Sequence, residues 1–228
     1  MKVVGLDLSG SIRKGSGMCF IEGDTIETVI LYSDEEILDK IRLFKAELVA
    51  IDAPLSLPKG REGLEDRNGP HLRECDRELL RRKIKFFPLT LGPMRKLTER
   101  GMNLKRVLEQ WGFRVIEVYP GGAQDIWGLP RKGESLEGLR TGLKNVGIKG
   151  DFSRMSHDEL DAVTAALVGL LYLVGECEEY GDRVEGTIVM PKSGSLEVLR
   201  RLFLEGNFSD EEFDNRTLHR TSQEPEKV

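Results

Sequence analysis

The longest stretch of this sequence without a charged residue runs from Ala162 to Gly175 and has 14 residues. A helix over this stretch would be apolar on nearly every side, so it must be buried around most of its circumference. The stretch is too short to cross a bilayer, which needs about 20 apolar residues. The chain therefore needs a large apolar surface around this helix, and the small alanines in it favour close packing against a sheet.

The composition is that of a globular protein. Of the 228 residues, 39% are hydrophobic and 32% are charged, which excludes a disordered or collagen-like chain. We expect one domain over residues 1–228, with a polar tail at about 205–228. Asp7 interrupts the first apolar segment, which argues against a signal peptide and favours a cytoplasmic protein with no membrane segment. Abundant Glu, Lys and Arg with few Gln is typical of a heat-adapted, thermophile-like composition.

The first fifty residues predict a mixed sheet. Residues 2–8 are typical of a buried strand, and residues 17–22 and 25–32 form a predicted hairpin around Gly23 and Asp24. A predicted helix at 35–45, for which Asp34 is a candidate N-cap, leads to an apolar strand at 48–51. A strand, a crossover helix and a second strand imply parallel pairing with the first strand.

The rest of the chain alternates helices with short strands. We expect helices at 72–83, 96–111, 135–144, 156–173 and 196–204, and strands at 114–118 and 185–190. The residues from Leu91 to Pro93 are predicted to separate the first two of these helices, and those from Tyr119 to Gly122 are predicted to form a tight turn.

Three acids lie at or near the ends of predicted apolar strands. They are Asp7, Asp52 and Glu117. Ligands bind beyond the carboxyl ends of parallel strands, so these side chains are candidates for one shared site. The alternative is three separate acids, each facing solvent, a turn or a basic partner.

Two further acids begin the apolar helix. Ser156 and Glu159 form a predicted capping box, which places Asp158 in the first turn, where the helix dipole favours an acid. Asp161 lies beyond that turn and has no such local reason. At i,i+3 spacing, Asp158 and Asp161 share a face and repel each other unless a cation lies between them.

Hard oxygen ligands without a thiolate cluster suit Mg²⁺ or Mn²⁺. The three cysteines are spread widely along the chain, which indicates neither a disulfide framework nor a zinc site. A pair of divalent ions can clamp the attacking water and the leaving oxygen of a phosphodiester. The acids therefore predict two-metal-ion hydrolysis of a phosphodiester, with Asp7, Asp52, Asp158 and Asp161 as catalytic residues.

The order of these motifs resembles the RNase H fold. The run His157-Asp158-x-x-Asp161-Ala162 is similar to the last catalytic helix of the RuvC family of Holliday-junction resolvases. Five motifs together resemble an uncharacterised prokaryotic family of predicted nucleases with this fold. They are Gly5-Leu6-Asp7-Leu8-Ser9, Ala50-Ile51-Asp52-Ala53-Pro54, Cys75-Asp76-Arg77-Glu78-Leu79, Glu117-Val118-Tyr119-Pro120 and His157-Asp158-Glu159-Leu160-Asp161-Ala162.

The resemblance implies a fold class and a ligand set. The fold would be an α/β mixed sheet in the strand order 3-2-1-4-5, with three antiparallel strands, two parallel ones and helices on both faces. Asp7 would bridge two metals, and Asp52 and Asp161 would each bind one. Asp158 or Glu117 would complete the metal shell.

The candidate nucleic-acid contact is a basic segment, within a predicted helical insertion at about 59–111. From His71 to Arg106 the chain has eleven Lys or Arg and four Asp or Glu, against a net charge of −5 overall. Clustered cations neutralise phosphates, and Phe86 and Phe87 could stack on an unpaired base. The candidate contacts are Arg73, Arg77, Arg81, Arg82, Lys83 and Lys85. A solvated helix face and two core phenylalanines are the structural alternative.

Two other functions stay open at this point. A nucleotide phosphotransferase of the actin and sugar-kinase type would share the strand order and the opening Gly-x-Asp strand, and ATP binding would distinguish it. A non-catalytic adaptor with the RNase H fold would keep the carboxylates without cleaving nucleic acid.

Overall fold

A computed structural model describes residues 1–204 of the chain. The strands are β1 (Lys2–Asp7), β2 (Ser16–Glu22), β3 (Thr25–Leu31), β4 (Leu48–Asp52), β5 (Val115–Val118), β6 (Cys177–Asp182) and β7 (Gly186–Pro191). The helices are α1 (Asp34–Phe44), α2 (Glu74–Arg81), α3 (Gly92–Gln110), α4 (Pro120–Trp127), α5 (Leu136–Lys144), α6 (His157–Leu173) and α7 (Ser195–Leu204). The predicted tail at 205–228 lies outside the described residues.

The strands form one mixed sheet in the order β3-β2-β1-β4-β5-β7-β6. The first five positions confirm the order 3-2-1-4-5 that the resemblance to the RNase H fold implied. The pairs β1–β2 and β2–β3 are antiparallel, whereas β1–β4 and β4–β5 are parallel. Two strands, β7 and β6, extend this arrangement beyond β5.

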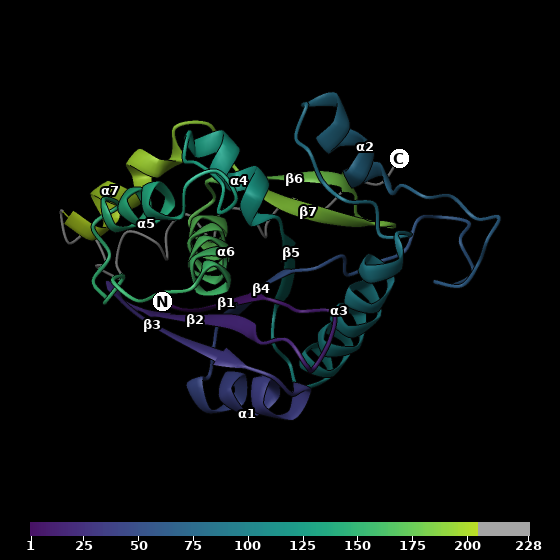
Figure 1. Cartoon of the computed structure of the whole chain (residues 1–228), viewed down its shortest axis with the longest axis horizontal. Coiled ribbons are helices and arrows are strands. Elements are labelled where there is room, and N and C mark those ends of the chain that lie inside the picture. Colours follow the sequence, from purple (N-terminus) through teal and green to yellow (C-terminus); the bar gives the residue numbers. More distant parts are fainter. Residues whose placement is uncertain (205–228) are drawn as a thin grey trace, which may run out of the picture.

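Helices cover both faces of the sheet (Figure 1). On one face, α6 lies across β1, β2 and β4, and α4, α5 and α7 surround it. On the other face, α1 and α3 pack against the alternate side chains of β1 and β4, such as Val4, Leu6 and Ile51. The helix α2 covers the β7–β6 end through Cys75 and Leu79. The basic helix α3 is thus the crossover between β4 and β5.

The apolar helix predicted at 156–173 is the centre of the fold. All residues from Leu160 to Leu171 in α6 are buried, as its uncharged sequence requires. Gly5 on β1 permits the close packing, because a Cβ there would overlap the backbone of Ala162 and Ala166. Gly17 on β2 does the same beneath Asp158. These two glycines therefore bring the first turns of α6 down onto the sheet.

Four local predictions were wrong. Residues from Tyr119 to Gly122 are not a turn, since α4 begins at Pro120, a residue suited to the first helical position. Pro93 likewise lies in the first turn of α3 and does not precede it. The N-cap of α1 is Ser33, in a capping box with Glu36. Strand β6 was missed because its sequence is acidic and half of it is exposed at the edge of the sheet.

None of the helices among residues 1–204 is both long and apolar enough to cross a membrane.

Candidate active site

Two of the predicted acids stand side by side on parallel strands. Asp7 and Asp52 are register partners at the carboxyl ends of β1 and β4. Asp7 lies two residues after Gly5, and Asp52 lies two residues after Ala50, and both Gly5 and Ala50 face α6. Alternate side chains of a strand point to the same face. The two carboxylates therefore lie on the same face of the sheet, at the end where a ligand would bind.

The first turns of α6 bring two more carboxylates to this place. Ser156 accepts a hydrogen bond from the backbone N–H of Glu159, and the Glu159 carboxylate accepts one from the N–H of Ser156, so the predicted capping box is confirmed. Glu159 also accepts a hydrogen bond of 2.7 Å from Thr28 on β3, which commits its carboxylate to the cap. Asp158 and Asp161 remain free to face the strand ends.

One ammonium group joins the helix acids to the sheet. The Lys132 Nζ lies 2.7 Å from Asp161 Oδ2, 3.6 Å from Asp7 Oδ2 and 3.7 Å from Asp158 Oδ1. His157 Nδ1 also lies 2.7 Å from Asp158 Oδ1. Sequence reasoning missed Lys132, and the only available signal was a basic pair in a loop bounded by proline and glycine.

The loop that carries Lys132 is anchored by its neighbour. Arg131 donates two hydrogen bonds to Asp125 on α4, of 2.8 and 2.6 Å. It also donates to the Tyr119 hydroxyl at 3.0 Å and to the Lys85 carbonyl at 3.2 Å. A bidentate arginine pair has a fixed geometry, so Arg131 sets the position from which Lys132 reaches the acids.

Asp161 is oriented by a second residue that the sequence did not indicate. Its Oδ1 accepts a hydrogen bond of 2.8 Å from Gln124 Nε2, which also donates to Thr164 Oγ1 at 3.2 Å. Gln124 is 1% exposed, so the contact is screened from water. Its position on α4, a helix that the sequence did not predict, hid it from sequence analysis. The bond leaves Oδ2 of Asp161 for a cation.

Burial and mutual repulsion raise the pKa values of the strand-end acids. For Asp7, desolvation comes first and the neighbouring charge of Asp52 second, and Lys132 only partly opposes them, so the pKa lies well above its usual value. For Asp52, desolvation and then the charge of Asp161 raise the pKa to about 8. Burial lowers the pKa of Lys132, but Asp7 and Asp161 outweigh that effect and raise it.

The donor atoms fit a hard divalent cation. Asp7 Oδ2 is buried and has no hydrogen-bond partner, so one carboxylate oxygen is left with its ion pair to Lys132 alone. The other donors are also carboxylate oxygens, which Mg²⁺ and Mn²⁺ prefer. As the side chains stand, no three His, Cys, Asp or Glu of residues 1–204 are arranged to hold an ion. The Lys132 ammonium lies among the carboxylates of Asp7, Asp158 and Asp161.

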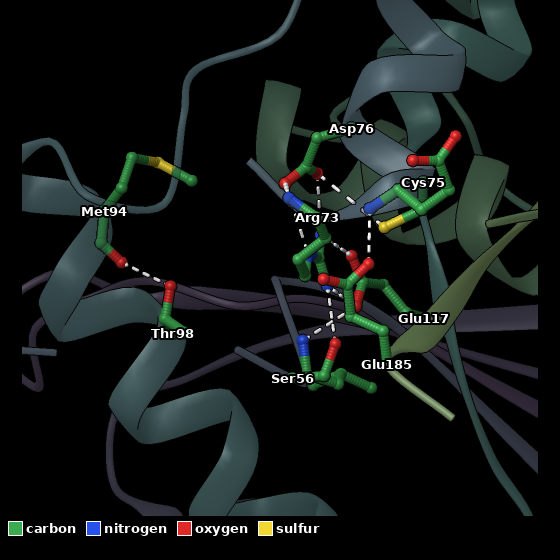
Figure 2. Close-up of polar contacts among 10 residues, drawn as sticks. Ser56, Arg73, Cys75, Asp76, Met94, Thr98, Glu117 and Glu185 are labelled. Carbon is green, nitrogen blue, oxygen red and sulfur yellow. Dashed lines mark hydrogen bonds and ion pairs between the residues drawn. The ribbon is translucent and has the colours of Figure 1, made fainter. Parts of the chain in front are cut away.

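Glu117 does not join the cluster, contrary to the prediction. It is the register partner of Ile51, one residue before Asp52, so its side chain points to the opposite face of the sheet. There both of its oxygens accept hydrogen bonds of 2.7 Å from Arg73, and Oε2 accepts another of 2.7 Å from the N–H of Leu55 (Figure 2). The carboxylate of Glu117 is therefore committed to Arg73 and Leu55.

Arg73 is also not the exposed phosphate contact that was predicted. It is 1% exposed and is held by Glu117, Asp76 and Ser56 (Figure 2). A buried guanidinium needs such partners, because an unpaired charge costs several kcal/mol. Arg73 therefore joins α2 to β5 and cannot reach a nucleic acid.

The other predicted phosphate contacts are exposed on or just after α2. Arg77 and Arg81 pair with Glu74, and Arg82 pairs with Glu78 and stacks over the Tyr180 ring. Lys83 and Lys85 form no ion pair within the described part of the chain. These exposed cations remain candidate contacts, with the two lysines the least neutralised.

The fold and the site define an α/β protein with four carboxylates at the carboxyl ends of β1 and β4 and the start of α6. Residues 5–185 match the family described as "Protein of unknown function (DUF429)", and the chain belongs to this family. This confirms the resemblance predicted from the five motifs. No curated protein shows a significant match to the chain.

Two solved structures of Thermus thermophilus RuvC are similar to the chain. One, described as RuvC in complex with Holliday junction substrate, is 15% identical, with a TM-score of 0.47, and the match covers 77% of this chain and 96% of that chain. The other, described as the RuvC structure, is 13% identical, with a TM-score of 0.44 and coverages of 77% and 97%.

Proposed function

We propose that this protein is a nuclease, a phosphodiester hydrolase that depends on Mg²⁺ or Mn²⁺ held by Asp7, Asp52, Asp158 and Asp161. The observation that carries the proposal is the convergence of three carboxylates on one cation, the Lys132 ammonium. Asp52 is the register neighbour of Asp7, and its charge raises the pKa of Asp7, so it belongs to the same group. Four acids gathered in this way are costly unless the site serves a positive ligand.

The surrounding residues divide the work of the site. The Gln124 amide orients Asp161 through Oδ1 and leaves Oδ2 for a cation. Lys132 offsets part of the negative charge of the carboxylates in the free protein and moves away when a divalent ion binds. Its side chain is 41% exposed, which allows that movement. The metal ions, when bound, would activate a water molecule and stabilise the leaving oxygen of the phosphodiester.

The substrate class is inferred from the exposed charges on and after α2. Exposed Arg and Lys side chains on and after α2 could neutralise the phosphates of a nucleic acid. They are Arg77, Arg81, Arg82, Lys83 and Lys85. Because such contacts release counterions, binding would weaken steeply with salt.

The test is a cleavage assay with labelled single-stranded, duplex and branched DNA, and with the matching RNAs, in Mg²⁺ or Mn²⁺. We expect cleavage by the wild type that EDTA abolishes, and none by Asp7→Asn or Asp161→Asn. Asp39→Asn is the matched control, because Asp39 is an acid on α1 whose ion pair is with the exposed Arg42 of the same helix. Absence of cleavage on every substrate, or full activity of Asp7→Asn, overturns the proposal.

One observation favours a second candidate, the non-catalytic adaptor. Lys132 already places one positive charge among three of the carboxylates, so the cluster is partly compensated without a metal. The adaptor would bind nucleic acid equally well with and without divalent ions. Calorimetry with Mn²⁺ separates the two candidates, since only the nuclease predicts metal-dependent heat that Asp7→Asn removes.

A further inference from the structure

An apolar pocket opens beside Asp52, outside the carboxylate cluster. Its volume is about 190 Å³, and it lies at the carboxyl ends of β4 and β5. The apolar lining comes from α2, from the segment between α2 and α3, and from α3. The lining residues are Leu79, Phe86, Phe87, Leu89, Met94 and Leu97.

Four polar side chains of the pocket wall, those of Arg73, Asp76, Glu117 and Tyr119, are already bonded to protein groups. Arg73 bonds Glu117 and Asp76, and Figure 2 shows Met94 of α3 opposite this network. The Tyr119 hydroxyl donates to the Lys85 carbonyl at 2.5 Å and accepts from Arg131. A ligand in this pocket would therefore be held by stacking and apolar contact and not by hydrogen bonds to the wall.

One aromatic side chain at the rim of the pocket is largely exposed to solvent. Phe87 is 73% exposed, although it lines the pocket, so its ring has lost little water and is free to cover a ligand. Phe86 beside it is partly buried against the cluster of Cys75, Leu79 and Ile84. One fixed ring and one free ring bordering a slot form a stacking platform for a planar group.

The size and position of the pocket select the planar group. Pockets for drug-sized ligands usually measure 300 to 1,000 Å³, so this one has room for a single ring system and not for a larger molecule. Asp52 belongs both to the pocket wall and to the carboxylate cluster. Lys85 is exposed and precedes the lining residue Phe86, and its carbonyl accepts hydrogen bonds from Tyr119 and from Arg131, the sequence neighbour of Lys132. A ring in the pocket would thus be joined to a phosphate near the acids.

We propose that this pocket receives one unpaired base of a polynucleotide, whose backbone passes outside along Lys85 to the carboxylates. This inference rests on the proposed nucleic-acid substrate and adds that the substrate must offer an unstacked base. Because the lining is mostly apolar and the side chains of Arg73, Asp76, Glu117 and Tyr119 bond to protein groups, the pocket accepts different bases and reads their unpaired state. The protein would accordingly prefer single-stranded, bulged or branched nucleic acid to an intact duplex.

The experiment measures base capture separately from cleavage. A single-stranded oligonucleotide that is abasic except for one 2-aminopurine is titrated with protein in Ca²⁺, and a matched oligonucleotide is abasic throughout. We expect the wild type to quench the fluorescence and to bind the abasic strand about tenfold more weakly. Phe87→Ala and Met94→Trp should each lose the quenching and the distinction between the two strands. Leu43→Ala, at a residue that is 75% exposed on α1, should keep both.

Each alternative result has a meaning. Equal binding of the 2-aminopurine and abasic strands, equal effects of Phe87→Ala and Leu43→Ala, or no binding of either strand overturns the base pocket. Displacement of the probe by free nucleoside monophosphate at similar concentration overturns a polynucleotide as the source of the base. Base-dependent binding by a protein that cleaves nothing retains the pocket and refutes the nuclease. Cleavage by a protein whose binding does not depend on the base refutes the pocket and retains the nuclease. Melting temperatures identify any variant that fails to fold.

Discussion

The Lys132 ammonium lies 2.7 Å from Asp161 Oδ2, between a helix and two strands that contribute acids to one site. Lys132 and Asp161 are far apart in sequence, and their contact depends on the loop that Arg131 anchors to α4. In the protein without metal, the Lys132 ammonium therefore already lies among the carboxylates. A divalent ion must compete with that residue, which gives the proposed function a measurable consequence.

Replacing Lys132 with Met should weaken the protein without metal and strengthen metal binding. The remaining carboxylates would repel one another with no cation among them, at a cost of about 1–2 kcal/mol, since Lys132 is partly exposed and solvent screens the charge. Melting with and without Mn²⁺ measures both effects, and Mn²⁺ should recover the lost stability. Lys149→Met removes an exposed pair with Asp24 and serves as the control. An unchanged response to Mn²⁺ in Lys132→Met would contradict competition between the lysine and the ion.

The stability of the metal-free protein should fall as the pH rises from about 4 to 8. The pKa of Asp52 is raised from 3.8 to about 8, so in this range the folded state keeps a proton that the unfolded state has lost. The stabilising contribution is complete below the unfolded pKa and disappears as the pH passes the folded one. Asp52→Asn should remove more than about 1 kcal/mol of this pH dependence. Urea denaturation at pH 5 and pH 8 in EDTA is the measurement. If the unfolding free energy changes equally between pH 5 and pH 8 in the variant and in the wild type, the pH dependence belongs to other groups.

Gly5→Ala should disturb the site through the helix. A Cβ at Gly5 would overlap backbone atoms of α6, which cannot move aside as a side chain can. We expect a loss of about 3 kcal/mol or more, the upper range for overpacking, together with loss of metal-dependent activity. Chemical denaturation compares it with Gly63→Ala, where a Cβ would meet no atom within 4 Å. Equal stability of the two variants would show that α6 does not need this close approach.

Replacing one partner of the buried ion pair between Arg73 and Glu117 should destabilise the protein more than replacing both partners. Arg73→Met leaves Glu117 and Asp76 buried without their cation, and we expect a loss of about 3–5 kcal/mol. The double variant Arg73→Met with Glu117→Met removes one of the stranded charges, so it should recover part of that loss. A double-mutant cycle by urea denaturation gives the coupling. Additive losses in the double variant would mean that the two side chains do not act as a pair.

The two unpaired lysines at the end of α2 should set part of the salt dependence of binding. Lys83→Gln combined with Lys85→Gln removes two candidate phosphate contacts, so the slope of log K against log salt should decrease by about 2. Fluorescence anisotropy with a labelled oligonucleotide at several salt concentrations measures it. Lys40→Gln with Lys45→Gln changes the same charge on and just after α1 and should leave the slope as it is. A slope unaffected by the first pair would return Lys83 and Lys85 to the role of solvated surface residues.

Local sequence patterns were sufficient for most of the framework. The apolar run of β1, the uncharged run of α6 and the capping box at Ser156 each depend on near neighbours, so the chain itself specifies them. The order of the first five strands followed once these elements were arranged like the RNase H fold. The acids Asp7, Asp52, Asp158 and Asp161 could be selected because each lies at the end of an apolar element, where burial makes a carboxylate costly.

The composition of the site was decided by tertiary structure. Glu117 and Asp52 both end apolar strands, but the register of β4 with β5 pairs Glu117 with Ile51 and turns it to the other face. Gln124 reaches the acids from α4, and Lys132 reaches them from the loop after α4, through contacts between residues distant in sequence. Sequence by itself determined which elements end in acids, because that depends on local burial and capping. Only the folded chain decided which acids meet and which cation lies among them, because strand register and loop anchoring are properties of long-range packing.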